Sequence, residues 1–312
     1  MGFGQGPGCD HLKPLGTKAA FAAYEAARHR LPQAMRQGTG QQVATLAEIA
    51  DQFDTFLLDA FGVLNIGDTA IAGVPERIAA FQAAGKRVLV LTNAASYPLA
   101  SLAAKYRKLG YDFGPDDIVS SRMALLAEIA GKPRQHYGLI AAPELGLDDL
   151  EGLDFTILAD DPAPYRDADA FVMLSSKDWT AARQDMLEQA LGTRPRPVWV
   201  GNPDIVAPRE TGFSIEPGFF AHRLADRTGI QPWFFGKPFS NIYDMAFARL
   251  GANADRNRIL MVGDTLHTDV LGAHSAGIAS ALITGFGFFA GCEISKAVAQ
   301  SNIRPDFVLQ RP

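Results

Sequence analysis

The most informative stretch of the chain is Phe56-Leu57-Leu58-Asp59-Ala60-Phe61-Gly62-Val63-Leu64. An apolar run ends here in the carboxylate of Asp59, and a glycine turn follows. Open α/β sheets bind ligands at the carboxyl ends of their strands, so this aspartate marks a candidate functional site. An aspartate at a strand end is more often a turn or helix-capping residue, and the rest of the chain must decide between the two roles.

Three later segments end in polar residues that can serve the same edge of a parallel sheet. Each follows an apolar run: they are Thr92-Asn93, Gly236-Lys237-Pro238 and Gly263-Asp264-Thr265, and Asp269 comes soon after the third. Two strand-end carboxylates, a hydroxyl and a lysine can together hold a divalent cation and a phosphoryl group. The combination therefore predicts a phosphoryl-transfer site, although each residue alone has an ordinary structural explanation.

The order of strands and helices predicts an α/β fold. From about residue 47, apolar strand patterns alternate with helical ones, which is typical of a parallel sheet covered by helices. The 312 residues are enough for two domains. The segment between Thr92 and Lys237 is too long for one crossover and contains strand-like runs of its own. The expected units are an N-terminal arm, 1–46, a core, 47–122 and 208–312, and an inserted α/β unit, 123–207.

The N-terminal arm and the composition set limits on location and partners. Residues 17–30 are alanine-rich and favour a helix, whose function the sequence does not indicate. Residues 1–8 lack the charged and apolar regions of a secretory signal, and no apolar run approaches the ~20 residues that span a bilayer. Cys9 and Cys292 stand alone, so neither zinc nor an oxidising compartment is expected. A net charge of −5 without a long basic run argues against nucleic acid, and we expect a cytoplasmic protein.

The candidate residues divide into a nucleophile, metal ligands and phosphate ligands. Asp59 can attack phosphorus and form an aspartyl-phosphate, with Asp264 as the second carboxylate on a bridging Mg²⁺. Thr92 can donate its hydroxyl to a phosphate oxygen, and Lys237 can neutralise nucleophile and phosphoryl oxygens together. Asp269 would complete the metal site indirectly, by orienting a water or Lys237. The alternatives are a strand-terminating turn for Thr92 and a surface position for Lys237.

Together these segments resemble the haloacid dehalogenase superfamily of Mg²⁺-dependent phosphotransferases. The resemblance covers about 47–312 and includes the order and spacing of all four motifs. The insertion resembles the C2-type cap of subfamily IIA, as do Gly201-Asn202-Pro203-Asp204 and the ending Arg304-Pro305-Asp306-Phe307-Val308. The resemblance implies a Rossmann-like core with an inserted C2-type cap. The phosphatases that the chain resembles act on N-acetylglucosamine-phosphate, para-nitrophenyl-phosphate and pyridoxal-phosphate. The resemblance also implies Mg²⁺ on Asp59, the Phe61 carbonyl and Asp264, and phosphate on Thr92, Asn93 and Lys237.

Phe61 is the main departure from this pattern. Phosphatases of the superfamily carry a second aspartate at this position, which protonates the leaving oxygen and then activates water. A phenyl ring transfers no protons, so turnover should fall by ~10²–10⁴-fold, least for good leaving groups. Asp178, Asp204 or His267 are the alternative proton sources, although His267 also reads as an ordinary loop histidine. Dehalogenases carry an aromatic residue here too, but they do not need the carboxylate of Asp264.

Residues of the cap are expected to select the substrate. Lys177 could bind an anionic group of the substrate, and Trp179 could contact a ring. The same segment is equally compatible with a structural role, in which Asp178 caps a helix that begins at Trp179. Asn202 would contact the substrate or support the hinge of the cap. Weaker specificity candidates are Arg209 and Glu210.

We therefore expect a Mg²⁺-dependent phosphatase of small phosphorylated metabolites. Two alternatives remain open. The first is a non-catalytic protein that binds a phosphometabolite or a regulatory partner, and the second is phosphoryl transfer to an acceptor other than water. By analogy with the superfamily, a homodimer is expected.

Overall fold

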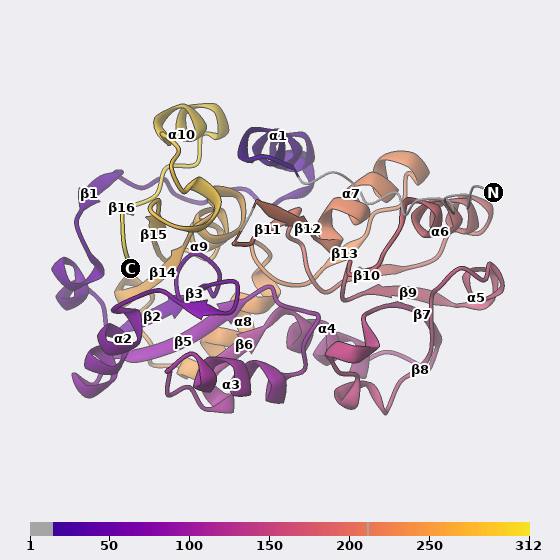
Figure 1. Ribbon diagram of the computed structural model, residues 1–312, viewed down its shortest axis with the longest axis horizontal. Coiled ribbons are helices and arrows are strands. Elements are labelled where there is room, and N and C mark those ends of the chain that lie inside the picture. The colour runs from indigo at the N-terminus through magenta and orange to yellow at the C-terminus, as the bar shows by residue number, and fades with distance from the viewer. Residues whose placement is uncertain (1–14, 211) are drawn as a thin grey trace, which may run out of the picture.

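The computed structural model describes residues 15–210 and 212–312. Cys9 and residues 1–8, for which the sequence predicted no secretory signal, lie outside this range. The described chain forms two α/β units side by side, each built on its own sheet (Figure 1). The predicted α/β class is confirmed. Every helix in the described part of the chain is too short or too polar to cross a bilayer.

The larger unit contains a seven-stranded sheet in which every neighbouring pair is parallel. In spatial order its strands are β1 (Gln41–Val43), β16 (Phe307–Leu309), β15 (Ala279–Ile283), β14 (Ile259–Gly263), β2 (Thr55–Leu58), β5 (Arg87–Thr92) and β6 (Ile118–Ser120). β2 is buried throughout because helices cover both faces of the sheet. Phe56 and Leu58 pack with α2 (Val74–Ala83) and α3 (Leu99–Lys108). Leu57 packs on the opposite face with α8 (Ser240–Leu250) and α9 (Leu271–Ser275).

β2 lies at the switch point of the strand order, where the strands that follow in the sequence are added first on one side of it and later on the other. The chain moves from β2 to β5 on one side, and β14 joins on the other side only much later in the sequence. Ligands of open α/β sheets bind outside the carboxyl ends of the strands at such a switch point. Asp59 follows β2 directly and so lies at this position.

The smaller unit contains a five-stranded parallel sheet. Its spatial order is β13 (Trp233–Phe234), β10 (Val198–Val200), β9 (Ala170–Met173), β7 (His136–Ile140) and β8 (Asp154–Ile157). One face packs against α5 (Ala163–Asp167), α6 (Ala181–Thr193) and α7 (Pro217–Thr228), and the other against α4 (Ser121–Ala130). The strand-like runs that the sequence predicted inside the insertion are therefore confirmed.

β13 is an exception to the predicted organisation. The sequence assigned it to the core pattern, but Trp233 pairs with Trp199 and Phe234 with Val200 in the smaller sheet. Phe234 also packs with Phe220 of α7 in the same apolar cluster. We therefore propose that the inserted domain extends from about residue 123 to about 234, beyond the expected boundary at 207.

Two hairpins flank the junction between the units. They are β3 (Asn65–Ile66) with β4 (Thr69–Ala70), and β11 (Val206–Pro208) with β12 (Phe213–Ile215). The remaining helix after β15 is α10 (Ser295–Ser301). Short turns of 3₁₀ or π geometry cover Arg28–Arg30, Leu46–Glu48, Ala50–Gln52, Pro115–Asp117, Pro143–Leu145, Asp148–Leu150, Arg256–Arg258, Leu266–Val270 and Gly287–Phe289.

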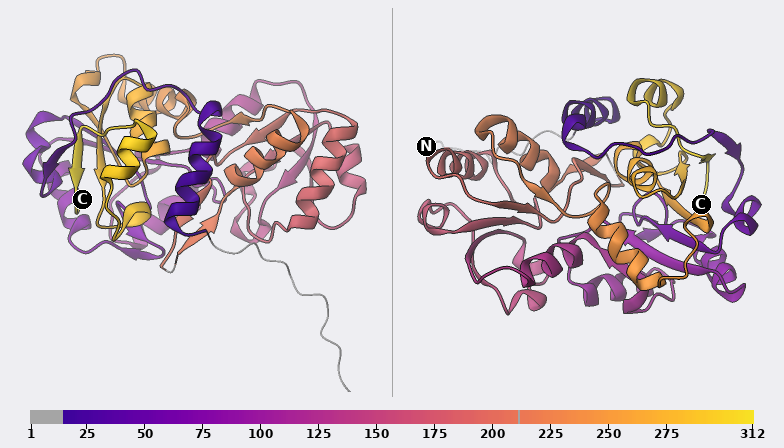
Figure 2. Two further views of the ribbon diagram at one scale, coloured as in Figure 1. Left: turned by 90° about the horizontal axis from the view of Figure 1, so that it is seen from above. Right: turned by 180° about the vertical axis from the view of Figure 1, so that it is seen from behind.

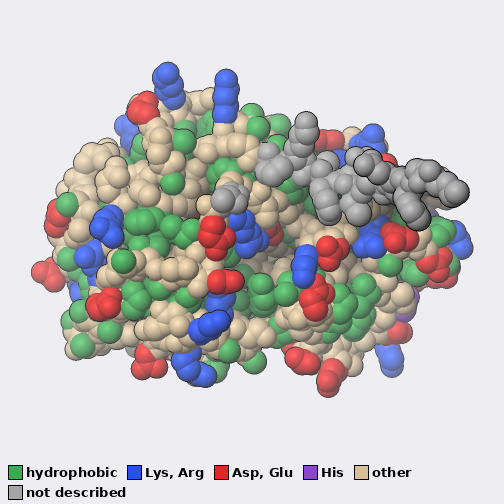
Figure 3. Space-filling view, in the orientation of Figure 1, with side chains coloured by type: hydrophobic (Ala, Val, Ile, Leu, Met, Phe, Trp, Pro, Cys, Tyr) green, Lys and Arg blue, Asp and Glu red, His purple; other side chains and the backbone are tan. Residues whose placement is uncertain are grey.

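The helix predicted in the N-terminal arm is α1 (Thr17–Ala27). It crosses the junction between the two units (Figure 2). The Tyr24 hydroxyl oxygen accepts a hydrogen bond from the Ile205 N–H, in the segment after β10, at 3.1 Å. Arg30 forms an ion pair with Asp226 of α7. The described part of the arm, residues 15–46, therefore packs on both units. Acidic and basic side chains are interspersed over the face shown in Figure 3.

Candidate active site

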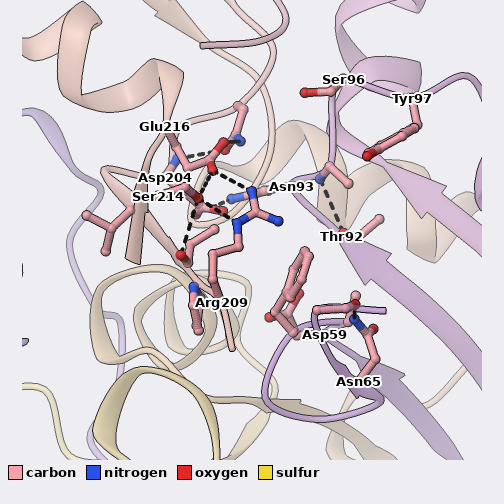
Figure 4. A pocket seen from close by; sticks show the side chains of 18 of the residues that line it. Asp59, Asn65, Thr92, Asn93, Ser96, Tyr97, Asp204, Arg209, Ser214 and Glu216 are labelled. Carbon is pink, nitrogen blue, oxygen red and sulfur yellow. Dashed lines mark hydrogen bonds and ion pairs between the residues drawn. The ribbon is translucent and has the colours of Figure 1, made fainter. Parts of the chain in front are cut away.

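The carboxyl ends of β2, β5 and β14 open into a cavity of about 460 Å³ between the two units (Figure 4). Asp59 follows β2, Thr92 ends β5 and Asp264 follows β14, so residues far apart in the sequence share one edge of the sheet. The smaller unit and its connections supply the opposite wall. The lining includes Phe61, Asn93, Lys105, Lys177, Asn202, Asp204, Arg209, Glu216 and Lys237.

Lys237 is the buried cation of the site. Its Nζ lies 2.5 Å from Asp59 Oδ1 and 2.8 Å from Asp269 Oδ1, and its side chain is 2% exposed. Burial acts to lower the pKa of Lys237, but the carboxylates of Asp269 and Asp59 outweigh it and the pKa is raised. The ammonium therefore keeps its charge at any physiological pH.

Asn93 holds the Lys237 backbone in place. The Lys237 N–H donates to Asn93 Oδ1 at 2.7 Å, and Asn93 Nδ2 donates to the Lys237 carbonyl at 2.9 Å. The preceding Gly236 has a φ of +120°, and a Cβ there would lie 2.4 Å from Asn93 Oδ1. Only glycine permits this close approach. The side chain of Asn93, predicted to bind phosphate, thus has a positioning contact with the lysine.

Three carboxylates converge beside this lysine. Asp59, Asp264 and Asp269 each offer an oxygen, and these atoms all lie within 4.8 Å of one another. Asp264 Oδ2 accepts from the Phe288 N–H at 2.7 Å. Asp269 Oδ2 accepts from the backbone N–H groups of Asp264 and Thr265 at 3.2 and 3.0 Å. Because Asp269 Oδ1 contacts Lys237, both oxygens of Asp269 already have partners, as expected for an indirect contribution to a metal site.

The electrostatics of this cluster favour a bound cation. Burial raises the pKa of Asp59 to about 6, with Lys237 opposing the shift and Asp269 adding to it. Burial also raises the pKa of Asp264 well above its ordinary value, and the charges of Asp59 and Asp269 raise it further. One lysine therefore does not balance the negative charge of the cluster. Oxygen ligands with excess negative charge are the donor set that Mg²⁺ prefers, so these residues fit such an ion.

Phe61 forms part of the cavity wall next to the nucleophile. The Lys105 Nζ and the Arg209 Cζ each lie 5.1 Å from the centre of its ring, a distance at which cations are attracted to an aromatic face. Arg209 is held in turn by Ser214 Oγ at 2.8 Å from its Nε and by Glu216 Oε1 at 3.1 Å from its Nη2. Two cationic side chains thus lie beside Phe61, the position at which phosphatases of the superfamily carry a general acid.

The other predicted ligands, Thr92, Asn202 and Lys177, also line the cavity but differ in burial. Thr92 is buried, and its Oγ1 accepts from the Ala94 N–H at 3.2 Å. Asn202 is buried, where its Nδ2 donates to Glu216 at 3.1 Å. Lys177 is half exposed and forms an ion pair with Glu144. We retain these residues as proposed substrate contacts.

Two of the three alternative proton sources lie away from the cavity. His267 is fully buried, stacks on Tyr24 and contacts Glu25 of α1 at 2.5 Å through its Nε2. The carbonyl of Asp178 accepts from Arg183 at 2.9 Å, and its side chain does not line the cavity. The third, Asp204, lines the cavity.

The interpretations of Asp178 and Trp179 in the cap were wrong. The N-cap of α6 is Thr180, whose hydroxyl accepts from the Arg183 N–H at 3.3 Å, so Asp178 does not cap this helix. Trp179 is 8% exposed and belongs to the apolar core of the smaller unit, where its Nε1 donates to Gln184 at 2.8 Å. Its ring fills the core of the cap and does not face the substrate cavity.

Two residues that line the cavity, Lys105 and Glu216, were not predicted from the sequence. Glu216 is buried and anchors both Arg209 and Asn202, and Lys105 lies beside Phe61. The sequence indicates Arg209 only as a weak specificity candidate. Glu216 precedes the helical Pro217, a pattern that marks a helix start and gives no sign of a cavity residue.

Comparisons with known proteins agree with this geometry. A haloacid dehalogenase-like hydrolase model matches residues 56–156, and a HAD-hydrolase-like model matches residues 234–311. The chain is 29% identical over 295 residues to the glycerol-3-phosphate phosphatase of Homo sapiens, covering 85% of this chain and 89% of that protein. It is 25% identical over 229 residues to the acid sugar phosphatase of Staphylococcus aureus (strain MRSA252), covering 73% and 85%.

Solved structures share the same architecture. A possible sugar phosphatase of the HAD superfamily from Cytophaga hutchinsonii superposes with a TM-score of 0.75 and 26% identity, covering 87% of this chain and 98% of that one. A glycerol phosphate phosphatase from Mycobacterium tuberculosis, in complex with magnesium, superposes with a TM-score of 0.61 and 25% identity, covering 76% and 69%. The chain therefore belongs to the haloacid dehalogenase superfamily of hydrolases, within its subfamily IIA phosphatases.

Proposed function

We propose that this protein is a Mg²⁺-dependent phosphatase of small phosphorylated metabolites that acts through an aspartyl-phosphate on Asp59. One observation carries the proposal: Asp59, Thr92, Lys237 and Asp264 meet at the edge of one parallel sheet, inside one cavity. A nucleophilic carboxylate, a hydroxyl donor, a buried ammonium and a second carboxylate are the groups that phosphoryl transfer to an aspartate requires.

The side chains of this site divide the reaction among them. Asp59 attacks the phosphorus, and the fixed charge of Lys237 stabilises the negative charge that collects on the phosphoryl oxygens. The hydroxyl of Thr92 donates to one of these oxygens. Asp269 keeps Lys237 in position, because its Oδ1 lies 2.8 Å from the lysine Nζ.

The metal would be held by the Asp59 carboxylate, the Phe61 carbonyl and Asp264. When bound, Mg²⁺ supplies positive charge that allows an anionic nucleophile to approach an anionic phosphate. The raised pKa values of Asp59 and Asp264 support this assignment, because burial, with a smaller contribution from neighbouring carboxylates, disfavours their charged forms and a bound cation would stabilise them.

The cavity supports a small substrate. Its volume of about 460 Å³ lies in the lower part of the range for metabolite sites, ~300–1,000 Å³. Related proteins are named for glycerol-3-phosphate, acid sugar and nitrophenyl phosphates, which are all phosphate monoesters of small alcohols or phenols. We therefore infer a phosphate monoester of similar size. A homodimer and a cytoplasmic location stay predictions.

Phosphate release measured with Mg²⁺ tests the proposal. The substrates are an aryl phosphate, an acyl phosphate and a panel of sugar, polyol and nucleotide phosphates. Wild type would be compared with Asp59→Asn, which keeps the size of the side chain and removes the nucleophile. We expect metal-dependent turnover that this variant lacks.

Other outcomes identify the alternatives. Full activity in Asp59→Asn would refute the aspartyl-phosphate. Ligand binding without turnover of any substrate would favour the non-catalytic binding protein. Loss of substrate phosphate without release of free phosphate, but with phosphorylation of an added alcohol, would favour transfer to a non-water acceptor.

A further inference from the structure

The cavity contains a carboxyl group that the proposed chemistry does not use. Hydrolysis through an aspartyl-phosphate needs a proton for the leaving oxygen and then a base for the attacking water. Phe61 supplies neither. Six carboxyl side chains line the cavity in the described part of the chain: Asp59, Asp68, Asp204, Glu210, Glu216 and Asp264.

Five of these six carboxyl groups have another role or location. Asp59 is the nucleophile and Asp264 belongs to the proposed metal site. The Asp68 side chain is 93% exposed at the rim, and Glu210 is also exposed. Glu216 is bound by Arg209 at 3.1 Å and by Ser214 at 2.5 Å. Only Asp204 remains.

We propose that Asp204 is the general acid and base of this enzyme, replacing the carboxyl group that is missing at Phe61. The inference rests on the proposed phosphatase function. It goes beyond it by assigning a catalytic residue from the connection between the two units to the reaction in the core.

Hydrogen bonds tie Asp204 to the reacting groups. Asn93 Nδ2 donates to Asp204 Oδ1 at 2.8 Å, and the same Nδ2 donates to the Lys237 carbonyl at 2.9 Å. Lys237 in turn contacts Asp59 at 2.5 Å. Figure 4 shows Asp204 and Asn93 side by side at the cavity. The recorded hydrogen bonds of the described residues engage Oδ1 of Asp204 and leave Oδ2 to carry a proton.

The backbone around Asp204 is fixed from several elements. The Asp204 N–H donates to Asn202 Oδ1 at 2.9 Å, and its carbonyl accepts from the Gly218 N–H of α7 at 3.0 Å. The next residue, Ile205, donates to the Tyr24 hydroxyl of α1 at 3.1 Å. A group held in this way has little freedom to leave the cavity, as general acid catalysis requires.

The surroundings keep Asp204 protonated near neutral pH. Burial raises the pKa of Asp204 to about 8. Lys237 and the Asn93 hydrogen bond act against this shift, while Asp59 and Asp269 add to it, and the Tyr24 phenol faces the group from α1. An acid with a pKa near the working pH can donate a proton and later take one back.

The two half-reactions balance with this assignment. In the first, Asp59 forms a bond to phosphorus and the bond from phosphorus to the leaving oxygen breaks. The proton of Asp204 passes to that oxygen, which leaves as an alcohol. In the second, water attacks the phosphorus while the Asp204 carboxylate takes its proton, and the bond to Asp59 breaks. Phosphate leaves, Asp59 is again a carboxylate and Asp204 is again protonated.

The wild-type enzyme provides the first test, because it requires no substitution. A bound general acid makes the rate insensitive to the leaving group. We therefore expect kcat/KM for an alkyl phosphate within about 100-fold of that for para-nitrophenyl phosphate, whose leaving group needs no proton. Turnover of para-nitrophenyl phosphate alone would overturn the role of Asp204 and leave the proposed phosphatase function intact.

Asp204→Asn provides the second test. The variant keeps an oxygen that accepts from Asn93 but has no acidic proton. Its kcat/KM should fall by ~10²–10⁴-fold for alkyl phosphates and by less than about tenfold for para-nitrophenyl phosphate. The high-pH limb of the wild-type profile should also disappear. An equal loss on both substrates, or full activity on both, would overturn the proposal, because a purely positional residue does not distinguish leaving groups.

Discussion

Replacing Lys237 with methionine should destabilise the protein strongly. Lys237 is 2% exposed and lies between Asp59 at 2.5 Å and Asp269 at 2.8 Å. Methionine has nearly the same length, so Lys237→Met removes the charge without opening a large cavity. Two buried carboxylates would then face each other beside Asp264 without a cation.

The expected magnitude follows from this geometry. Removing one partner of a buried ion pair costs about 3–5 kcal/mol, since the remaining charge loses both its partner and its hydration. At roughly 2 °C per kcal/mol for a chain of this size, Tm should fall by about 6–10 °C at pH 8. The loss should be smaller at pH 5, because burial raises the pKa of Asp59 to about 6 and this carboxylate can then take up a proton.

The assay is thermal unfolding at pH 5 and pH 8, with and without Mg²⁺. A matched control is Lys132→Met. Lys132 lies in the turn after α4, is partly exposed and forms an ion pair with Glu128 of α4. Such surface pairs contribute ~0–1 kcal/mol, so its Tm should change by about 2 °C or less. Mg²⁺ should restore part of the stability of Lys237→Met but not that of the control. Equal Tm values for Lys237→Met and wild type at pH 8 would show that Lys237 does not neutralise these buried carboxylates.

Three further predictions concern the metal, an internal histidine and the arm. Asp264→Asn should weaken Mg²⁺ binding in calorimetry at least tenfold, and unchanged affinity would remove Asp264 from the metal site. Burial lowers the pKa of His222 to about 4, so the folded state binds fewer protons than the unfolded chain between pH 6.5 and 4. Stability should therefore fall by about 3 kcal/mol as the pH drops through this window, as followed by urea unfolding, and His222→Phe should lack this part of the pH dependence. Tyr24→Phe leaves the Ile205 N–H without its partner, which should cost about 1–3 kcal/mol in the same assay. Stability equal to wild type would show that α1 does not hold this segment.

The sequence predicted the part of the site that depends on strand ends. Apolar runs that finish in Asp59, Thr92 and Asp264 can only bring these residues together if their strands are parallel neighbours, and the sheet has that order. The positions of Lys237 and Asp269 followed from the same motif pattern. This part is predictable because it rests on local patterns and one topological rule.

The remaining contacts depend on pairs of residues that are far apart in the chain. His267 contacts Glu25 across 242 positions, which no local pattern predicts. Arg209 reaches the Phe61 ring only because the β11–β12 hairpin lies across the junction. β13 is two residues long and pairs with β10 of the smaller sheet. Tertiary packing, not the local sequence, determines this pairing.

Detection of a phosphorylated aspartate at position 59 tests whether Asp59 is the nucleophile. The enzyme would be mixed with Mg²⁺ and a rapidly reacting aryl phosphate, quenched with acid during turnover and reduced with borohydride, which converts an aspartyl-phosphate to homoserine. Peptide mass spectrometry should find homoserine at position 59 in wild type and none in Asp59→Asn. Phosphate release without any modification at position 59, or equal release by Asp59→Asn, would contradict the assignment of Asp59 as the nucleophile.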